Sequence, residues 1–173
     1  MSAADTAKAA ALVFFAAIVQ VTLLSSVDLL GGTPDLVLVT LVGVALLRGS
    51  IVGAVAGFAA GLIVDTANLQ TLGVTSLLLT LAGYWIGRYG ETTGRDRAHA
   101  PFLSVAVVTV LYAFGALFLH YMLGDPASAR IVLVDSLPAK LLFNLLLTLP
   151  VYALVRRLLA PVREEHAEVQ LLG

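Results

Sequence analysis

Residues 49–65 read GSIVGAVAGFAAGLIVD, and this stretch decides how the chain folds. A small or acidic residue stands at every fourth position: Gly49, Gly53, Gly57, Gly61 and then Asp65. Residues four apart lie on one face of an α-helix. In lipid, where no hydrophobic force drives helices together, small residues at this spacing let two backbones approach closely. The pattern therefore predicts a membrane helix with a groove along one face.

The glycine face has two interpretations that the sequence leaves open. It packs either against a neighbouring helix of the same chain or against the transmembrane helix of a partner. For the second interpretation, the residues that bind the partner are the four glycines and Asp65, with the steric fit at the glycines outweighing any single polar contact.

The composition supports a membrane protein. The chain has 173 residues, of which 60% are hydrophobic and 12% charged, and its mean hydropathy is +0.99. Soluble domains have about 45–50% apolar and about 25% charged residues. So few charges cannot cover the surface of a water-soluble globule, and a soluble enzyme or a nucleic-acid binder is excluded. The net charge of -1 gives no attraction to nucleic acid, and the absence of cysteine excludes disulfides and thiolate metal sites.

The apolar runs predict an all-α integral membrane protein with a single domain over residues 1–173. A membrane span needs about 20 apolar residues. We expect a bundle of six transmembrane helices, followed by a polar tail over 161–173. Residues 131–137 either cross the membrane, dip into it or lie on it. The expected spans are residues 9–27, 35–48, 50–65, 74–88, 101–123 and 138–159.

The basic residues predict the orientation, because cytoplasmic loops are enriched in lysine and arginine. Six spans place both termini on one side, together with the turn at 48–50 and the loop at 88–100. That side carries Lys8, Arg48, Arg88, Arg95, Arg97, Arg156, Arg157 and Arg163. The opposite side has Arg130, with Lys140 just inside the last helix. Both termini are therefore expected in the cytoplasm.

Polar residues within the expected spans are candidates for contacts inside the bundle or with a ligand. Tyr84 and Asn144 stand in polar stripes of four-residue spacing. Lys140 either extends to the lipid headgroups, forms an ion pair or contacts a ligand. Asp35 and Asp65 lie at span ends, where each either faces water or pairs with Lys140.

No catalytic motif is present. The chain lacks the HExxH zinc helix, the GxSxG nucleophile elbow and the GxxxxGK[ST] phosphate loop. No pair of aspartates shares an intramembrane face as an aspartyl protease would need. We therefore expect a protein that is not an enzyme and uses neither a cofactor nor a metal.

Several short motifs resemble the rod shape-determining protein MreD family. They are Pro34-Asp35-Leu36, Gly57-Phe58-Ala59-Ala60-Gly61-Leu62, Asp65 and Leu72-Gly73. The resemblance extends over most of the chain. Residues Pro34, Asp35, Gly57, Phe58, Gly61 and Asp65 carry over as motif positions without an assigned chemistry.

The resemblance implies a non-catalytic scaffold in the bacterial inner membrane that belongs to the cell-elongation machinery. It implies an MreC-like single-span partner, and indirectly an MreB-like actin homologue and a cell-wall polymerase and transpeptidase. Through these, the protein would help to control cell shape and peptidoglycan synthesis.

The fold is also similar to the substrate-binding subunits of energy-coupling-factor transporters. This similarity supplies an alternative function, a small-molecule-binding membrane subunit of a transporter. It predicts a pocket between helices, lined by residues such as Tyr84 and Asn144.

Overall fold

A computed structural model describes residues 3–24, 31–69, 71–93, 99–124 and 128–159. The expected polar tail and three of the basic residues used for the orientation, Arg95, Arg97 and Arg163, lie outside the described residues. Within these residues the regular structure is helical, as the apolar runs predicted. The helices are α1 (Ala3–Val19), α2 (Leu36–Arg48), α3 (Ser50–Ala67), α4 (Val74–Thr93), α5 (Ala100–Met122) and α6 (Leu137–Leu159).

Two π-helical segments extend this set. The first, η1 (Gln20–Leu24), continues α1, and the second, η2 (Ile131–Ser136), leads directly into α6. The last helix therefore begins at Ile131 and not near Pro138 as expected. Asp135 and Ser136 are part of this helix, because the apolar residues 131–134 extend it toward its N-terminus.

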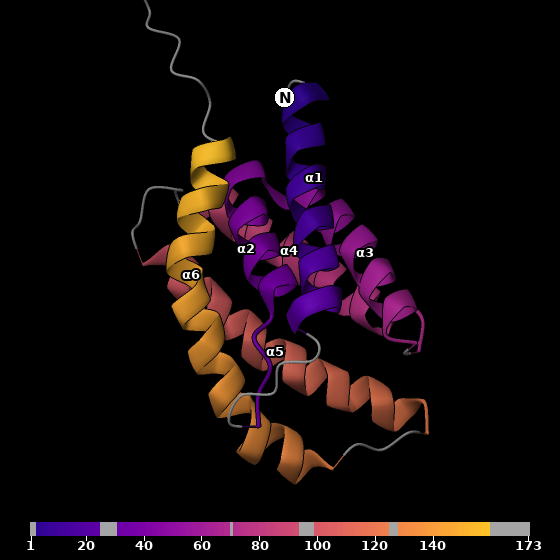
Figure 1. Ribbon diagram of the computed structural model, residues 1–173. Helices are drawn as coiled ribbons and strands as arrows, with labels where there is room; N and C mark the ends of the chain where they lie inside the picture. Colours follow the sequence, from indigo (N-terminus) through magenta and orange to yellow (C-terminus); the bar gives the residue numbers. More distant parts are fainter. Residues whose placement is uncertain (1–2, 25–30, 70, 94–98, 125–127, 160–173) are drawn as a thin grey trace, which may run out of the picture.

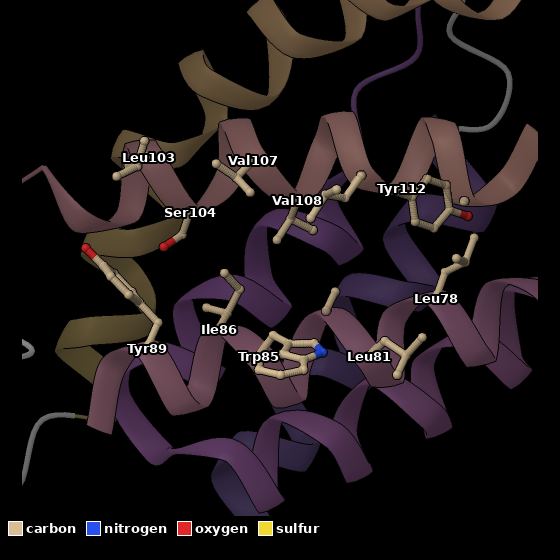
Figure 2. Close-up of a pocket in the computed structure, with 13 residues that line it drawn as sticks. Leu78, Leu81, Trp85, Ile86, Tyr89, Leu103, Ser104, Val107, Val108 and Tyr112 are labelled. Carbon is tan, nitrogen blue, oxygen red and sulfur yellow. The ribbon is translucent and has the colours of Figure 1, made fainter. Parts of the chain in front are cut away.

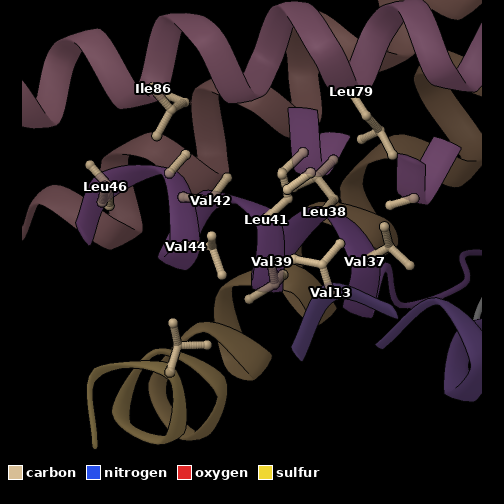
Figure 3. Packing of buried hydrophobic residues seen from close by; sticks show 14 of the residues in the cluster. Val13, Val37, Leu38, Val39, Leu41, Val42, Val44, Leu46, Leu79 and Ile86 are labelled. Carbon is tan, nitrogen blue, oxygen red and sulfur yellow. The ribbon is translucent and has the colours of Figure 1, made fainter. Parts of the chain in front are cut away.

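The short helix α2 is the centre of the bundle. Ten of its 13 residues are buried, and it contacts each of the other five α-helices. Figure 1 shows α2 and α4 in the middle, with α6 on one side and α1 and α3 on the other. Its residues are apolar on every side, as expected for a helix surrounded by others. In Figure 3, Leu38, Leu41 and Val42 of α2 lie with Leu79 and Ile86 of α4 in this core.

Four helical stretches of the described residues are long and apolar enough to cross a membrane: Thr6–Leu24, Ser50–Ala67, Ala100–Met122 and Ile131–Leu159. Many large apolar side chains on these stretches point outward, among them Phe14, Phe58 and Leu146. Such an apolar surface is typical of a protein surrounded by lipid and unusual for a protein surrounded by water. The chain is therefore an all-helical membrane protein.

Candidate functional site

The glycine face of α3 is covered by α4. A Cβ atom added to Gly53 would collide with the backbone of Gly83, and one added to Gly57 would collide with the carbonyl of Leu79. A Cβ atom on Gly61 would overlap the backbone of Ser76. The two helices thus touch backbone to backbone along a contact that we call the seam.

The seam corrects the partner-binding role that we expected for the glycines. Of the two interpretations, the structure supports packing against a helix of the same chain, because α4 occupies the face that a partner helix would need. The matching residues of α4 are Gly83 and Gly87, where an added Cβ atom would meet the backbone of Gly53 and of Ser50, while Gly90 lies in the same way against Leu46 of α2. Their spacing in the sequence was a signal of this contact that we had not used.

At one end of the seam, Glu91 of α4 holds the start of α3. Its Oε1 accepts hydrogen bonds from the backbone N–H of Ser50 at 2.8 Å and from the Ser50 hydroxyl at 3.0 Å. Gly49, with a φ of 92°, ends α2 and forms the tight turn before α3. The bonds from Ser50 stabilise the carboxylate and lower the pKa of Glu91 below its usual 4.5.

At the other end of the seam, Asp65 of α3 caps the start of α4. Its carboxylate accepts backbone N–H groups of Gly73 at 2.8 Å, Thr75 at 3.3 Å and Ser76 at 3.4 Å. Asp65 is fully buried, so it does not face water, and the carboxylate that pairs with Lys140 is that of Asp35. A helix leaves its first N–H groups without partners, and a carboxylate there satisfies them. The contact of Asp65 with a partner that we expected is therefore wrong, because its carboxylate is buried and already binds the start of α4.

The polar contacts at the ends of the seam are one polar centre of the molecule. A second polar centre joins α2 with α5 and α6, which come much later in the sequence. The Lys140 Nζ lies 3.3 Å from Asp35 Oδ2, which is the ion pair that we had left as one alternative. Asp35 also caps α2, since its Oδ1 accepts the N–H of Leu38 at 2.9 Å. The Asn144 amide oxygen accepts the Asp35 N–H at 2.8 Å, and its NH2 group donates to the Thr109 hydroxyl at 3.0 Å.

The turn before α2 is held by Gln20 of η1. Its side-chain NH2 donates to the Pro34 carbonyl at 3.1 Å, and its side-chain oxygen accepts the Leu36 N–H at 2.8 Å. Pro34 is buried between these contacts. The Pro34-Asp35 motif is therefore a structural element that fixes the entry of the chain into α2.

Tyr112 of α5 lies between Lys140 of the second polar centre and Thr75 at the end of the seam. The Lys140 Nζ lies 5.0 Å from the centre of its ring, within the range of a cation–π interaction. Its hydroxyl lies 3.4 Å from the hydroxyl of Thr75, whose N–H binds Asp65. Beside these groups is a polar cavity of about 400 Å³, lined by Gln20, Thr33, Asp35, Asn68, Thr75, Tyr112 and Lys140 among others.

Tyr84 and Phe58 face outward. Tyr84 is 41% exposed and packs edge-to-face on Trp85, with the ring centres 5.7 Å apart. The expectation that Tyr84 points into the bundle is wrong, whereas Asn144 is fully buried and does so. Phe58 is 52% exposed, and its carbonyl accepts a hydrogen bond from the Ser76 hydroxyl at 2.6 Å.

Among the described residues, no three side chains of histidine, aspartate or glutamate lie close enough to hold a metal ion. The buried carboxylate of Asp65 is used for capping, and that of Asp35 for capping and the ion pair. The polar groups at the ends of the seam and at the second polar centre thus hold helices together, and two cavities lined in part by Lys140, of about 400 and 420 Å³, have room for a small molecule.

The comparison with protein families gives a match over nearly the whole chain. The model of the rod shape-determining protein MreD family matches residues 8–160, which is nearly the whole chain. No curated protein and no solved structure matches significantly. The matched region includes all residues of the seam and of the second polar centre. The chain therefore belongs to the MreD family of rod shape-determining membrane proteins.

Proposed function

We propose that the protein is a non-catalytic scaffold of the cell-elongation machinery that binds an MreC-like single-span membrane protein. The observation that carries this proposal is the family match over residues 8–160. The interior supports a rigid scaffold, since its buried carboxylates and amides are satisfied within the chain. Because α4 covers the glycine face, the partner helix would pack on another, lipid-facing surface.

The experiment is an affinity purification of the tagged protein from its native membranes, followed by mass spectrometry. We expect recovery of an MreC-like single-span protein, with the MreB-like homologue and the wall polymerase and transpeptidase following it more weakly. Recovery of an ATPase pair and a coupling membrane subunit would overturn the proposal.

The membrane arrangement that we infer has six crossing helices and both termini in the cytoplasm of a bacterial inner membrane, and its architecture is similar to that of energy-coupling-factor binding subunits. The helix α4 has 20 residues, about 30 Å, which is enough to cross. With 13 residues, α2 covers only about 20 Å, but the extended residues before it lengthen the path.

Single-cysteine labelling tests this arrangement, since the natural chain has no cysteine. Thr6→Cys and His99→Cys should react with an impermeant thiol reagent only after the inner membrane is opened. Thr71→Cys and Ser128→Cys should react in intact spheroplasts. Labelling of both pairs from the same side would contradict six crossings.

The second candidate function is a small-molecule-binding subunit, which the polar cavity beside Lys140 favours. A cavity of about 400 Å³ lies within the ~300–1,000 Å³ range of small-ligand sites. A ligand that binds only the folded state raises the melting temperature by mass action. We would screen vitamins and soluble cell-wall precursors against purified protein. A flat response across the set would count against this candidate.

A further inference from the structure

An apolar groove of about 600 Å³ separates α4 from α5 (Figure 2). Its walls are leucine, valine and aromatic side chains, and several of them are exposed at the surface of the bundle. Figure 2 shows Leu81 and Trp85 of α4 facing Val107 of α5 across the gap. The groove residues include Leu78, Leu81, Trp85, Tyr89, Leu103, Ser104, Val107 and Leu111.

One buried polar side chain of the groove lacks a partner. Ser104 is 3% exposed, and its Oγ makes no hydrogen bond to any of the described residues. A buried hydroxyl without a partner is uncommon, because the group has lost its water without replacing it. In Figure 2 the hydroxyl points from α5 toward α4, at the same end of the groove as the Tyr89 hydroxyl. The other end is lined by Leu78, Leu111 and Tyr112, and the Tyr112 hydroxyl is bonded to Thr75.

The groove has the length of one lipid leaflet. Along α4 it extends from Leu78 to Tyr89, and along α5 from Leu103 to Gly115. At 1.5 Å per residue these stretches are about 16–18 Å long. Half of the hydrocarbon core of a bilayer is about 15 Å thick.

The polar end of the groove lies near the end of α4 and the start of α5. Tyr89 lies four residues before the end of α4, and Ser104 lies four residues after the start of α5. Each is therefore about 6 Å inside its helix end. A position this close to a helix end is near the boundary between the hydrocarbon core and the headgroups.

We propose that the groove binds one acyl chain of a membrane phospholipid, with the ester carbonyl of that chain accepting a hydrogen bond from Ser104. The arrangement matches an amphiphile, because the unpartnered Ser104 hydroxyl and the Tyr89 hydroxyl lie at one end, whereas the Tyr112 hydroxyl at the other end is already bonded to Thr75. A partner helix that crosses the membrane needs about 30 Å of contact, and the groove supplies about half of that length. The proposal does not depend on the proposed scaffold function.

Trp85 is the single tryptophan of the chain and lines the groove, so it reports on the occupant directly. The experiment titrates the full-length protein in detergent with phosphatidylglycerol that carries dibrominated acyl chains, and follows the quenching of Trp85 fluorescence. We expect quenching that saturates at a low lipid-to-detergent ratio. Ser104→Ala should raise the midpoint roughly threefold to tenfold, and Ser104→Thr, which keeps the hydroxyl, should stay close to the natural protein.

A matched pair of variants separates the groove from the rest of the lipid-facing surface. Val107→Phe fills the groove and should remove the saturable quenching. Leu146→Phe places the same ring on the exposed surface of α6 and should leave the titration unchanged. Quenching that rises linearly, or that is equal in all four variants, overturns the proposal. If Val107→Phe instead loses a co-purified protein while its titration is unchanged, a partner helix fills the groove and the lipid proposal is wrong.

Discussion

The two faces of α4 differ in how closely a neighbouring helix approaches. On one face, Gly83 and Gly87 allow the backbone of α3 to lie directly against α4. On the other, Leu81 and Trp85 keep α5 away and leave a groove of about 600 Å³. Both faces belong to one helix in one membrane, so the side chains and not the environment set the separation. The seam is closed and internal, whereas the groove is open to an occupant.

The same glycine-to-alanine change on the two sides of α4 should give opposite results. Gly57→Ala places a methyl group against the Leu79 carbonyl, which is backbone and cannot move aside. It should lower the free energy of unfolding by about 1–3 kcal/mol. Gly115→Ala meets only the Leu78 Cδ2 atom at 2.6 Å, the end of a flexible side chain, and gains helix propensity. Its effect should stay within about 0.5 kcal/mol or be stabilising.

Thermal unfolding in detergent measures both variants. Equal losses at the two positions would mean that α3 and α4 are not in backbone contact in the membrane. Ala59→Leu, on the exposed side of α3, controls for the added volume and should leave the melting temperature unchanged.

Removal of the cap at the end of the seam should have the next largest effect. Asp65→Ala leaves the N–H groups of Gly73, Thr75 and Ser76 without their acceptor. We expect the free energy of unfolding to fall by about 1–2 kcal/mol. Thr66→Ala, the adjacent and exposed residue, should change it by less than about 0.5 kcal/mol. A loss at Thr66 as large as that at Asp65 would exclude a specific capping role.

The contact at the opposite end of the seam should depend on pH. The pKa of Glu91 is lowered in the folded protein by the hydrogen bonds from Ser50, so folding favours the charged form. The stabilisation is present above the unfolded pKa of about 4.5 and is lost as the pH falls through the lower, folded pKa. The natural protein should therefore lose more stability between pH 6 and pH 3 than Glu91→Gln, measured by unfolding at each pH. Parallel pH profiles would contradict this contact.

The smallest effect is expected in the groove. Ser104→Ala removes a hydroxyl that makes no hydrogen bond to the described residues. In detergent without added lipid, its melting temperature should match that of the natural protein. A clear loss of stability would show that the hydroxyl has a partner within the fold.

The sequence predicted the kinds of contact better than the identity of the neighbours. Glycines four apart correctly indicated a close helix contact, and the polar, deeply placed Asn144 correctly indicated an interior hydrogen bond. Spacing defines a face but does not say which element covers it, so α4 was not identified as the neighbour of α3. Asp65 was misplaced because the chain after α3 folds back and offers its backbone N–H groups to the carboxylate.

Tyr84 shows a limit of four-residue stripes. With 3.6 residues per turn, each step of four advances the side chain by about 40° around the helix. Ser76 is buried, but Tyr84, two steps later, has turned to the surface. The ion pair between Asp35 and Lys140 depends on the packing of α2 against α6, which local pattern does not determine.

The most direct test of the scaffold account is photo-crosslinking in native membranes. A photoreactive residue would replace one exposed side chain on each of three outward faces, at Phe15, Phe58 or Leu146. The account predicts that at least one position captures an MreC-like single-span protein and that the others capture lipid. Capture of a transporter's coupling subunit, or of no protein at any position while the purified protein binds a small molecule beside Lys140, would contradict it.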